Sequence, residues 1–204
     1  MPPIPVQTLS SGPAAESAIV GALARKSVVL IGMMGAGKSS VGRKLALRLA
    51  LPFVDADTEI EAAAGMAIPE IFEIRGEPEF RAGEARVIAR LLESGPQVMA
   101  TGGGAYMNPE TRALIGQKGI SIWLKANFDV LMKRIKRRTD RPLLRTLDPA
   151  ATLQRLIEDR YPVYAHSDIA IESRDVLHDV IVDELVQALS AHLKIVSPEE
   201  GVRP

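Results

Sequence analysis

The residues most clearly arranged for chemistry form a glycine-rich segment near the start of the chain, Gly32–Ser39. Its sequence, Gly-Met-Met-Gly-Ala-Gly-Lys-Ser, fits the pattern G-x-x-x-x-G-K-[ST] without a mismatch. In such a loop the glycines bring backbone N–H groups close to phosphate oxygens, and the following helix adds its N-terminal dipole. Lys38 would reach the β- and γ-phosphates, and the Ser39 hydroxyl would ligate Mg²⁺. An apolar strand before the loop and a helix after it favour a nucleoside triphosphate site over a plain turn.

Two acids, Asp55 and Asp57, follow a second short apolar strand, where parallel α/β sheets hold their ligands. One carboxylate there could hold Mg²⁺, usually through water, and the other could accept a proton from an attacking hydroxyl or orient it. The structural alternative is that Asp57 caps a helix starting near Thr58, with Glu59 and Glu61 as solvated charges. The two carboxylates alone leave both interpretations open.

Two arginines, Arg81 and Arg160, lie in helical stretches and allow two interpretations. Arg81 precedes Glu84 by three residues within the helical stretch Pro78–Leu92, which is typical of a surface ion pair. Arg160 comes near the end of another helix, where it could serve the helix dipole. If both arginines point into one pocket, they would clamp a carboxylate, because guanidinium forks match its geometry.

Three successive glycines, Gly102, Gly103 and Gly104, follow Thr101 at the end of a third apolar strand. Glycines cost conformational entropy, and a mere connection would not require three of them. Their exposed N–H groups and small size would let a polyhydroxylated ligand lie against the backbone. A plain turn is the alternative.

The segment from Lys133 to Arg145 is strongly basic, with seven Lys or Arg residues against one acid, Asp140. Its first half is helical in pattern, and its second half, from Thr139 to Asp148, has the pattern of a loop. A flexible basic segment of this kind can close over a nucleotide as a lid, exclude water and stabilise a transferring phosphoryl group. A solvated basic face or a nucleic-acid patch is the alternative, although no aromatic residue is interleaved to stack on bases.

The composition is that of an ordinary globular chain of one domain. The 204 residues include 25 Lys plus Arg, 25 Asp plus Glu and no cysteine. Charge balance argues against a general nucleic-acid or membrane-surface binder, and the lack of cysteine excludes disulfide scaffolds, thiolate metal sites and thiol catalysis. No apolar run approaches the ~18 residues of a membrane span. We therefore expect no nucleic-acid and no membrane partner.

Residues 1–26 differ from the rest in being rich in Pro, Ser and Ala, and we expect a partly disordered N-terminal extension. A short helix is possible over Pro13–Arg25. The basic residues Arg25 and Lys26 come last, which does not fit a secretory signal peptide, and an organellar presequence would be richer in arginine. The expected location is therefore cytoplasmic.

The elements that must position the chemical residues alternate between strand and helix. Strands are predicted at Ser27–Ile31, Pro52–Asp55, Gln97–Ala100, Ser121–Leu124 and Ile169–Ile171. Because they are apolar without alternation, both sheet faces should be covered, which predicts an α/β fold with a five-stranded parallel sheet sandwiched by helices. This single domain should span residues 27–196, with a tail over 197–204. Its last helix is predicted from Asp175 to about Lys194, with a core stripe formed by Val176, Val180, Leu185, Leu189 and Leu193.

Taken in order, these motifs resemble one family, the shikimate kinases, which are P-loop enzymes of the nucleoside-monophosphate-kinase-like fold. The resemblance spans about Val28 to His192. It rests on Gly32–Ser39, Asp55–Asp57, Phe80–Glu84 (Phe-Arg-x-x-Glu), Gly102–Gly104, Arg141–Leu144 (Arg-Pro-Leu-Leu) and Arg160–Tyr164 (Arg-x-Pro-x-Tyr). It implies Mg²⁺-dependent transfer of the ATP γ-phosphate to the 3-hydroxyl of shikimate, in aromatic amino acid biosynthesis, by a monomer.

The resemblance also implies a role for each matching position. The ATP-binding residues would be Gly35, Ala36, Gly37, Lys38, Ser39, Ser40, Arg134 and Arg141, with Arg134 against the adenine. Mg²⁺ would be held by Ser39, with Asp55 in its outer shell. The residues that bind shikimate would be Asp57, Arg81, Gly102, Gly103, Gly104 and Arg160. Asp57 would act as base or orienter, Lys38 and Arg141 would stabilise phosphoryl charge, residues 56–93 would form the substrate-binding region, and residues 137–149 a mobile lid.

Two features depart from the family pattern, and two rival functions stay open. Ala56 stands where threonine is common, and the stretch Tyr164–Asp168 is altered, so no adenine contact is assigned to Arg174. One rival is another P-loop kinase, acting on gluconate or a nucleoside monophosphate. The other is a non-catalytic NTP-binding regulatory module. A GTPase is disfavoured because no Asn-Lys-x-Asp motif is present.

Overall fold

The computed structural model describes residues 13–136 and 148–195 of the chain. Five strands lie in this part, namely β1 (Ser27–Ile31), β2 (Phe53–Asp55), β3 (Val98–Ala100), β4 (Gly119–Lys125) and β5 (Ile169–Glu172). The helices are α1 (Pro13–Leu23), α2 (Lys38–Arg48), α3 (Ala56–Ala64), α4 (Ile68–Glu93), α5 (Pro109–Lys118), α6 (Phe128–Ile135), α7 (Pro149–Tyr164) and α8 (His178–His192), with one 3₁₀ turn, η1 (Ala105–Met107). None of these helices has the length and apolar character needed to cross a membrane.

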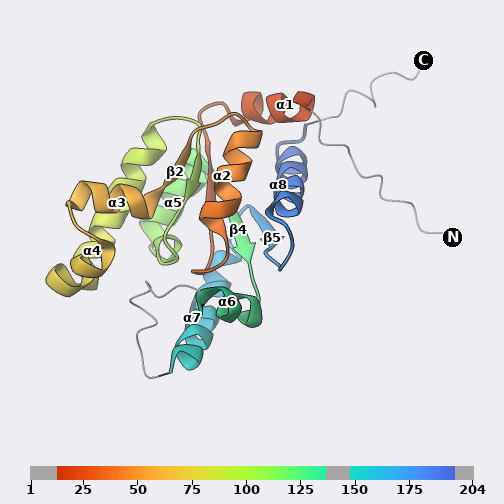
Figure 1. The fold of residues 1–204 in the computed structure, drawn as a ribbon. Helices are drawn as coiled ribbons and strands as arrows, with labels where there is room; N and C mark the ends of the chain where they lie inside the picture. Colours follow the sequence, from red (N-terminus) through yellow and green to blue (C-terminus); the bar gives the residue numbers. More distant parts are fainter. Residues whose placement is uncertain (1–12, 137–147, 196–204) are drawn as a thin grey trace, which may run out of the picture.

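The five strands form one parallel sheet in the order β2-β3-β1-β4-β5, which confirms the predicted fold class. Val28 of the central strand β1 pairs with Val98 on one side and Ile120 on the other. All five residues of β1 are buried, as expected for a strand covered on both faces. Helix α2 packs against α8 and α4 packs against α5, while in Figure 1 α1 lies at the top, α3 and α4 at the left, and α6 and α7 at the bottom.

Helix α1 precedes the predicted start of the kinase domain, yet it contributes to the same core. Ile19 and Leu23 are fully buried members of the main hydrophobic cluster, and α1 packs against α8. Arg48 of α2 pairs with Glu16 of α1 and, at 3.1 Å, with Asp183 of α8. Residues 13–23 are therefore an integral layer of the described fold.

The last helix begins later than its apolar pattern predicted. Helix α8 starts at His178, and the chain before it runs as a connection from β5. Leu185 and Leu189 are fully buried, as the predicted core stripe requires, but Val176 and Val180 are 39% and 41% exposed. The predicted core stripe was wrong for these two valines. Both fit helical spacing, but Val176 lies in the connection before α8 and Val180 lies in the first turn of the helix.

Several predicted segments fall outside the described residues. These are positions 1–12, the C-terminal tail 197–204 and most of the predicted lid, including Arg141. The last two residues of the predicted lid range, Asp148 and Pro149, are described, and they form the start of helix α7. The Asp148 carboxylate accepts hydrogen bonds from the N–H groups of Ala150 and Ala151, and Pro149 is the first residue of α7.

Candidate active site

The predicted phosphate loop connects the central strand β1 to helix α2. Gly37 is the N-cap of α2 with φ 94°, a left-handed conformation that favours glycine. At Gly32 a Cβ atom would lie 2.8 Å from the carbonyl oxygen of Leu124, so only glycine fits against β4. The Lys38 ammonium donates to the carbonyl oxygens of Gly32 (2.9 Å) and Met33 (3.0 Å). The loop therefore places a fixed positive charge and a helix N-terminus at the end of the sheet.

Asp55, at the end of β2, joins this loop to helix α3. Its Oδ2 accepts a hydrogen bond from the Ser39 hydroxyl at 2.6 Å, and its Oδ1 accepts from the N–H of Asp57 at 3.2 Å. Asp55 is thus the N-cap of α3, and the helix starts at Ala56. The expectation that Asp57 might cap a helix starting near Thr58 was therefore wrong. Asp57 lies in the first helical turn.

The glycine run after β3 allows charged side chains to lie directly against the backbone. A Cβ atom at Gly102 would lie 2.6 Å from Glu84 Oε1 and 2.9 Å from Asp57 Oδ1, and one at Gly103 would lie 3.2 Å from Arg160 Nη1. A Cβ atom at Gly104 would collide with the guanidinium of Arg81. The three glycines thus leave room for four charged residues, and the run is more than a plain turn.

These residues line one pocket, which we call the acceptor pocket. Its lining is Met34, Asp57, Ile68, Phe72, Phe80, Arg81, Glu84, Gly102, Gly103, Gly104 and Arg160. The backbone of α4 leaves helical geometry at Gly76 (φ 80°), and the part of the helix after this kink carries Arg81 and Glu84. The lining combines apolar side chains with four charged ones, which suits a small ring bearing a carboxylate and hydroxyls.

Glu84 lines the acceptor pocket, although the sequence analysis did not assign it to the site. Arg81 pairs with it at 2.7 Å, so the expected i,i+3 ion pair exists, but Glu84 is only 2% exposed. Among the described residues, its Oε1 has no hydrogen-bond partner. Burial raises the pKa of the Glu84 carboxyl, and Asp57 adds to this effect, whereas Arg81 and Arg160 oppose it. The Phe-Arg-x-x-Glu motif was the signal that could have identified it.

Arg160 lies inside α7 and is only 7% exposed, so it does not serve as a surface charge at the helix end. Its Nη1 has no hydrogen-bond partner within the described part of the chain. Arg81 and Arg160 line the same pocket, which is the arrangement that a carboxylate clamp requires. A buried guanidinium with an unused donor indicates that an anion completes this site.

A second pocket, which we call the nucleotide pocket, opens over the phosphate loop. Its lining is Gly35, Gly37, Lys38, Ser39, Ser40, Asp55, Asp57, Thr101, Gly102, Gly103, Lys133, Arg134, Ile135, Asp175, Val176 and His178. Val176 and His178 were not expected here, because no motif contains them and their position depends on where α8 begins. Ala36 belongs to the loop but is fully buried, and its carbonyl oxygen accepts a hydrogen bond from the Ser173 hydroxyl at 2.7 Å.

Arg134 connects the phosphate loop to the segment after β5. Its guanidinium donates to the Ser173 hydroxyl (2.9 Å), the Arg174 carbonyl oxygen (2.7 Å) and the Gly35 carbonyl oxygen (3.3 Å). The side chain of Arg174 pairs with Glu184 of α8. Arg134 therefore forms part of the wall on which a nucleotide base would lie.

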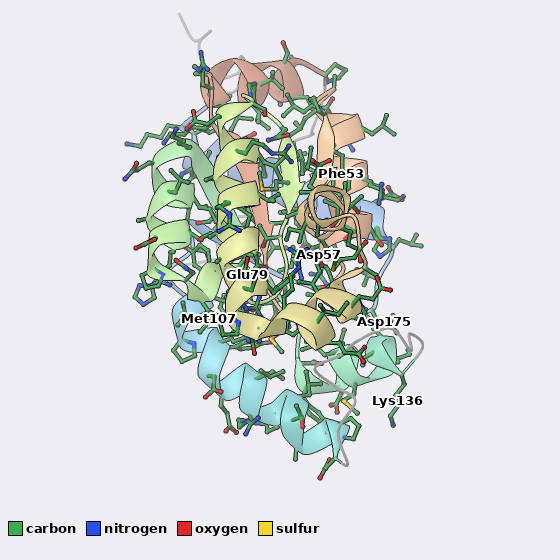
Figure 2. All side chains as sticks on the ribbon, turned by 90° about the vertical axis from the view of Figure 1, so that its left-hand side faces the viewer. Phe53, Asp57, Glu79, Met107, Lys136 and Asp175 are labelled. Atoms are coloured by element: carbon green, nitrogen blue, oxygen red, sulfur yellow. The ribbon has the colours of Figure 1, made fainter. Side chains whose placement is uncertain are left out.

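The two pockets meet at Asp57, Gly102 and Gly103, which line both of them. Figure 2 shows Asp57 near the middle of this face, and Asp175 beside α6 on the nucleotide side. A terminal phosphate held by the loop would therefore face a group held in the acceptor pocket, with a carboxylate between them. This geometry and the fold define a P-loop kinase that acts on a small molecule.

Comparisons with known proteins identify the kinase. The shikimate kinase family model matches residues 34–190. Shikimate kinases from Bradyrhizobium diazoefficiens and Rhodopseudomonas palustris are each 64% identical to the chain, over 87% and 90% of its length and 86% and 91% of theirs. A solved shikimate kinase from Acinetobacter baumannii, in complex with shikimate, is 34% identical with a TM-score of 0.81, covering 86% of this chain and 97% of that one. The chain belongs to the shikimate kinase family and is an ATP-dependent kinase.

Proposed function

We propose that this chain transfers the γ-phosphate of ATP to the 3-hydroxyl of shikimate, forming shikimate 3-phosphate and ADP in the shikimate pathway to aromatic amino acids. The observation that carries the proposal is the meeting of the two pockets at Asp57. The solved relative whose structure contains shikimate supports the choice of acceptor. Shikimate has one carboxylate and three hydroxyl groups, which match the two arginines and the glycine run.

On the nucleotide side, the N–H groups of residues 35–40 and the Lys38 ammonium bind the phosphates of ATP. Lys38 already lies over the loop through its bonds to two loop carbonyls, so it needs only to exchange these acceptors for phosphate oxygens. Arg134 lies against the adenine. The role of Arg141 at the phosphates rests on the family resemblance, since this residue lies outside the described part of the chain.

Ser39 and Asp55 have the donor chemistry for Mg²⁺. Their oxygens are 2.6 Å apart at the mouth of the nucleotide pocket, and hard oxygen ligands are those that Mg²⁺ prefers. Within the described residues there is no cluster of three acidic or histidine side chains, which fits an ion that keeps several waters and binds substrate phosphates. When bound, Mg²⁺ would neutralise charge on the β- and γ-phosphates.

On the acceptor side, Arg81 and Arg160 bind the shikimate carboxylate, and Gly102, Gly103 and Gly104 contact the ring hydroxyls. Glu84 fixes the direction of the Arg81 guanidinium through its 2.7 Å ion pair. Asp57 accepts a hydrogen bond from the 3-hydroxyl. The hydroxyl oxygen attacks the γ-phosphorus, the bond between that phosphorus and the bridging oxygen of ADP breaks, and the hydroxyl proton passes to Asp57.

Phosphoryl transfer leaves little covalent chemistry to the protein, so positioning and charge stabilisation carry the reaction. The phosphate loop sets the position of the donor, and the arginine clamp sets that of the acceptor. The loop follows the packed strand β1, and the two arginines lie within the packed helices α4 and α7. These elements keep the reacting groups in line. Exclusion of water from the junction would prevent hydrolysis of ATP as a rival reaction.

The experiment that tests this function measures ADP release with ATP and Mg²⁺ in the presence of shikimate, gluconate or AMP, each added separately. We expect turnover with shikimate, and a phosphate monoester on its 3-oxygen detected by ³¹P NMR. Turnover with gluconate or AMP instead would favour the rival kinases. Binding of ATP without turnover on any acceptor would favour a regulatory module.

A monomer in the cytoplasm completes the proposal. The monomeric state rests on the family resemblance. Sedimentation equilibrium, with and without both substrates, measures the oligomeric state directly.

A further inference from the structure

Tyr164, the last residue of α7, lies behind the acceptor pocket rather than in its lining. It is fully buried, and its hydroxyl donates a hydrogen bond to the carbonyl oxygen of Gly103. The same hydroxyl oxygen lies 3.9 Å from the sulfur of Met33 in the phosphate loop. Tyr164 therefore contacts the glycine run at Gly103, one of the three residues that line both pockets.

The hydroxyl of Tyr164 is a permanent donor. Burial raises its pKa to about 12, against the opposing influence of Arg160 one helical turn earlier. The phenol thus stays protonated throughout the pH range in which the enzyme would work. The hydroxyl is therefore available to donate to the Gly103 carbonyl oxygen throughout this range.

The ring of Tyr164 is held in place by two other aromatic rings. The centroid of Trp123 lies 5.9 Å away and that of Tyr161 lies 6.2 Å away. Tyr161 donates a comparable hydrogen bond, but to the carbonyl oxygen of Ala126 beyond the end of β4. The two tyrosines therefore share a cluster and a type of bond, and differ in which loop they hold.

From this arrangement we infer that Tyr164 is a positioning residue for the acceptor. The carbonyl of Gly103 and the N–H of Gly104 belong to one planar peptide unit, so a donor that fixes the carbonyl also fixes the direction of the N–H. Gly104 lines the acceptor pocket and is not among the residues of the nucleotide pocket. Tyr164 thus orients a backbone donor toward the acceptor without touching it. The inference rests on the proposed function, because it requires shikimate in this pocket.

The test compares Tyr164→Phe with the matched control Tyr161→Phe, each of which loses one hydroxyl that donates to a backbone carbonyl oxygen. We expect Tyr164→Phe to raise the KM for shikimate about fivefold or more, while the KM for ATP changes less than about twofold. Tyr161→Phe should leave both KM values near those of the unmodified enzyme. Equal changes in the two variants, equal changes in the two KM values, or no change in Tyr164→Phe would overturn the inference.

A second measurement does not depend on the folding of a variant at position 164. The chain contains three tyrosines, so the unmodified enzyme labelled with 3-fluorotyrosine should give three ¹⁹F resonances. They can be assigned with Tyr161→Phe and Tyr106→Phe. Shikimate should shift the Tyr164 resonance more than that of Tyr161, and a Tyr164 resonance that stays in place would overturn the inference. If the unmodified enzyme shows no turnover of shikimate, the proposed function fails instead, so the two failures are distinguishable.

Discussion

The Ser39 hydroxyl lies 2.6 Å from Oδ2 of Asp55, although the two residues are 16 positions apart in the chain and follow different strands. The other oxygen of the same carboxylate accepts from the N–H of Asp57. One side chain therefore links the phosphate loop to the helix that carries the proposed base. Asp55 thus helps to hold the phosphate loop and Asp57 in their relative positions.

Asp55→Asn tests the magnesium role of this link. Asparagine keeps an oxygen for the helix cap but loses the charge, so the free energy of unfolding should change little. We expect the Mg²⁺ concentration for half-maximal activity to rise about fivefold or more, because outer-shell residues of metal sites contribute on this scale. The control is Asp179→Asn, which affects an exposed pair with Lys44. An unchanged Mg²⁺ requirement in Asp55→Asn would contradict the assignment.

Gly104→Ala tests the space that the glycine run provides. Gly104 has φ −95°, which any residue can adopt, so the substitution acts through its Cβ and not through backbone strain. The new methyl would force the Arg81 guanidinium away, and we expect kcat/KM for shikimate to fall about tenfold, a cost of about 1.4 kcal/mol. Gly116→Ala is the control, because a Cβ there meets no atom within 4 Å. Equal activity of the two variants would refute the steric argument.

The buried pair Arg81–Glu84 predicts a dependence of shikimate affinity on pH. Burial raises the pKa of Glu84, so it takes up a proton at a higher pH than an exposed glutamate. Below that pKa the carboxyl is neutral and no longer holds Arg81 by charge. The KM for shikimate should therefore rise as the pH falls through the raised pKa of Glu84.

The control for this pH effect is Glu84→Gln, which is neutral at every pH and nearly isosteric. Its KM for shikimate should be higher than that of the unmodified enzyme at pH 8. As the pH falls, its KM should rise less than that of the unmodified enzyme, because Glu84 is no longer there to take up a proton. If the two pH profiles run parallel, another group accounts for the rise, and the role given to Glu84 is wrong.

Ile19→Ala tests whether α1 belongs to the folded core. Deleting a fully buried isoleucine side chain beyond Cβ should lower the free energy of unfolding by about 2–5 kcal/mol, measured by urea denaturation. Ile19→Val should cost about 0.5–1.5 kcal/mol. Both variants should keep the KM values of the unmodified enzyme, because α1 lies away from the two pockets. A loss below about 0.5 kcal/mol in Ile19→Ala would mean that α1 is a dispensable extension.

Residues at strand ends were the part of the site that the sequence predicted best. The phosphate loop, Asp55, Asp57 and Gly102–Gly104 each follow an apolar strand directly, and the carboxyl ends of parallel strands meet at one edge of the sheet. A residue that directly follows a predicted strand can therefore be placed at this edge of the sheet from the sequence. The strands themselves were predictable because each contains a short apolar run, and β1, β3 and β4 up to Leu124 are buried.

Residues on helices were harder to predict, because helical spacing does not say which face is buried. Arg81 and Glu84 have the spacing of a surface pair, and only the kink of α4 at Gly76 and the packing around it bury Glu84. Val176 continues the spacing of α8 but lies before its first turn. Ile19 and Leu23 lie in the short helix expected over Pro13–Arg25, but their burial was not predicted, because α1 packs against α8, far along the chain.

The central claim is that Asp57, at the junction of the two pockets, takes part in the transfer itself. The most direct test is a single-turnover measurement on Asp57→Asn. A preformed complex of the enzyme with ATP and Mg²⁺ is mixed with shikimate and the reaction is stopped by rapid quench, and the binding of each substrate is measured separately. We predict that ADP forms at least about 100-fold more slowly than in the unmodified enzyme while ATP affinity stays within about threefold. A single-turnover rate equal to that of the unmodified enzyme would contradict the account.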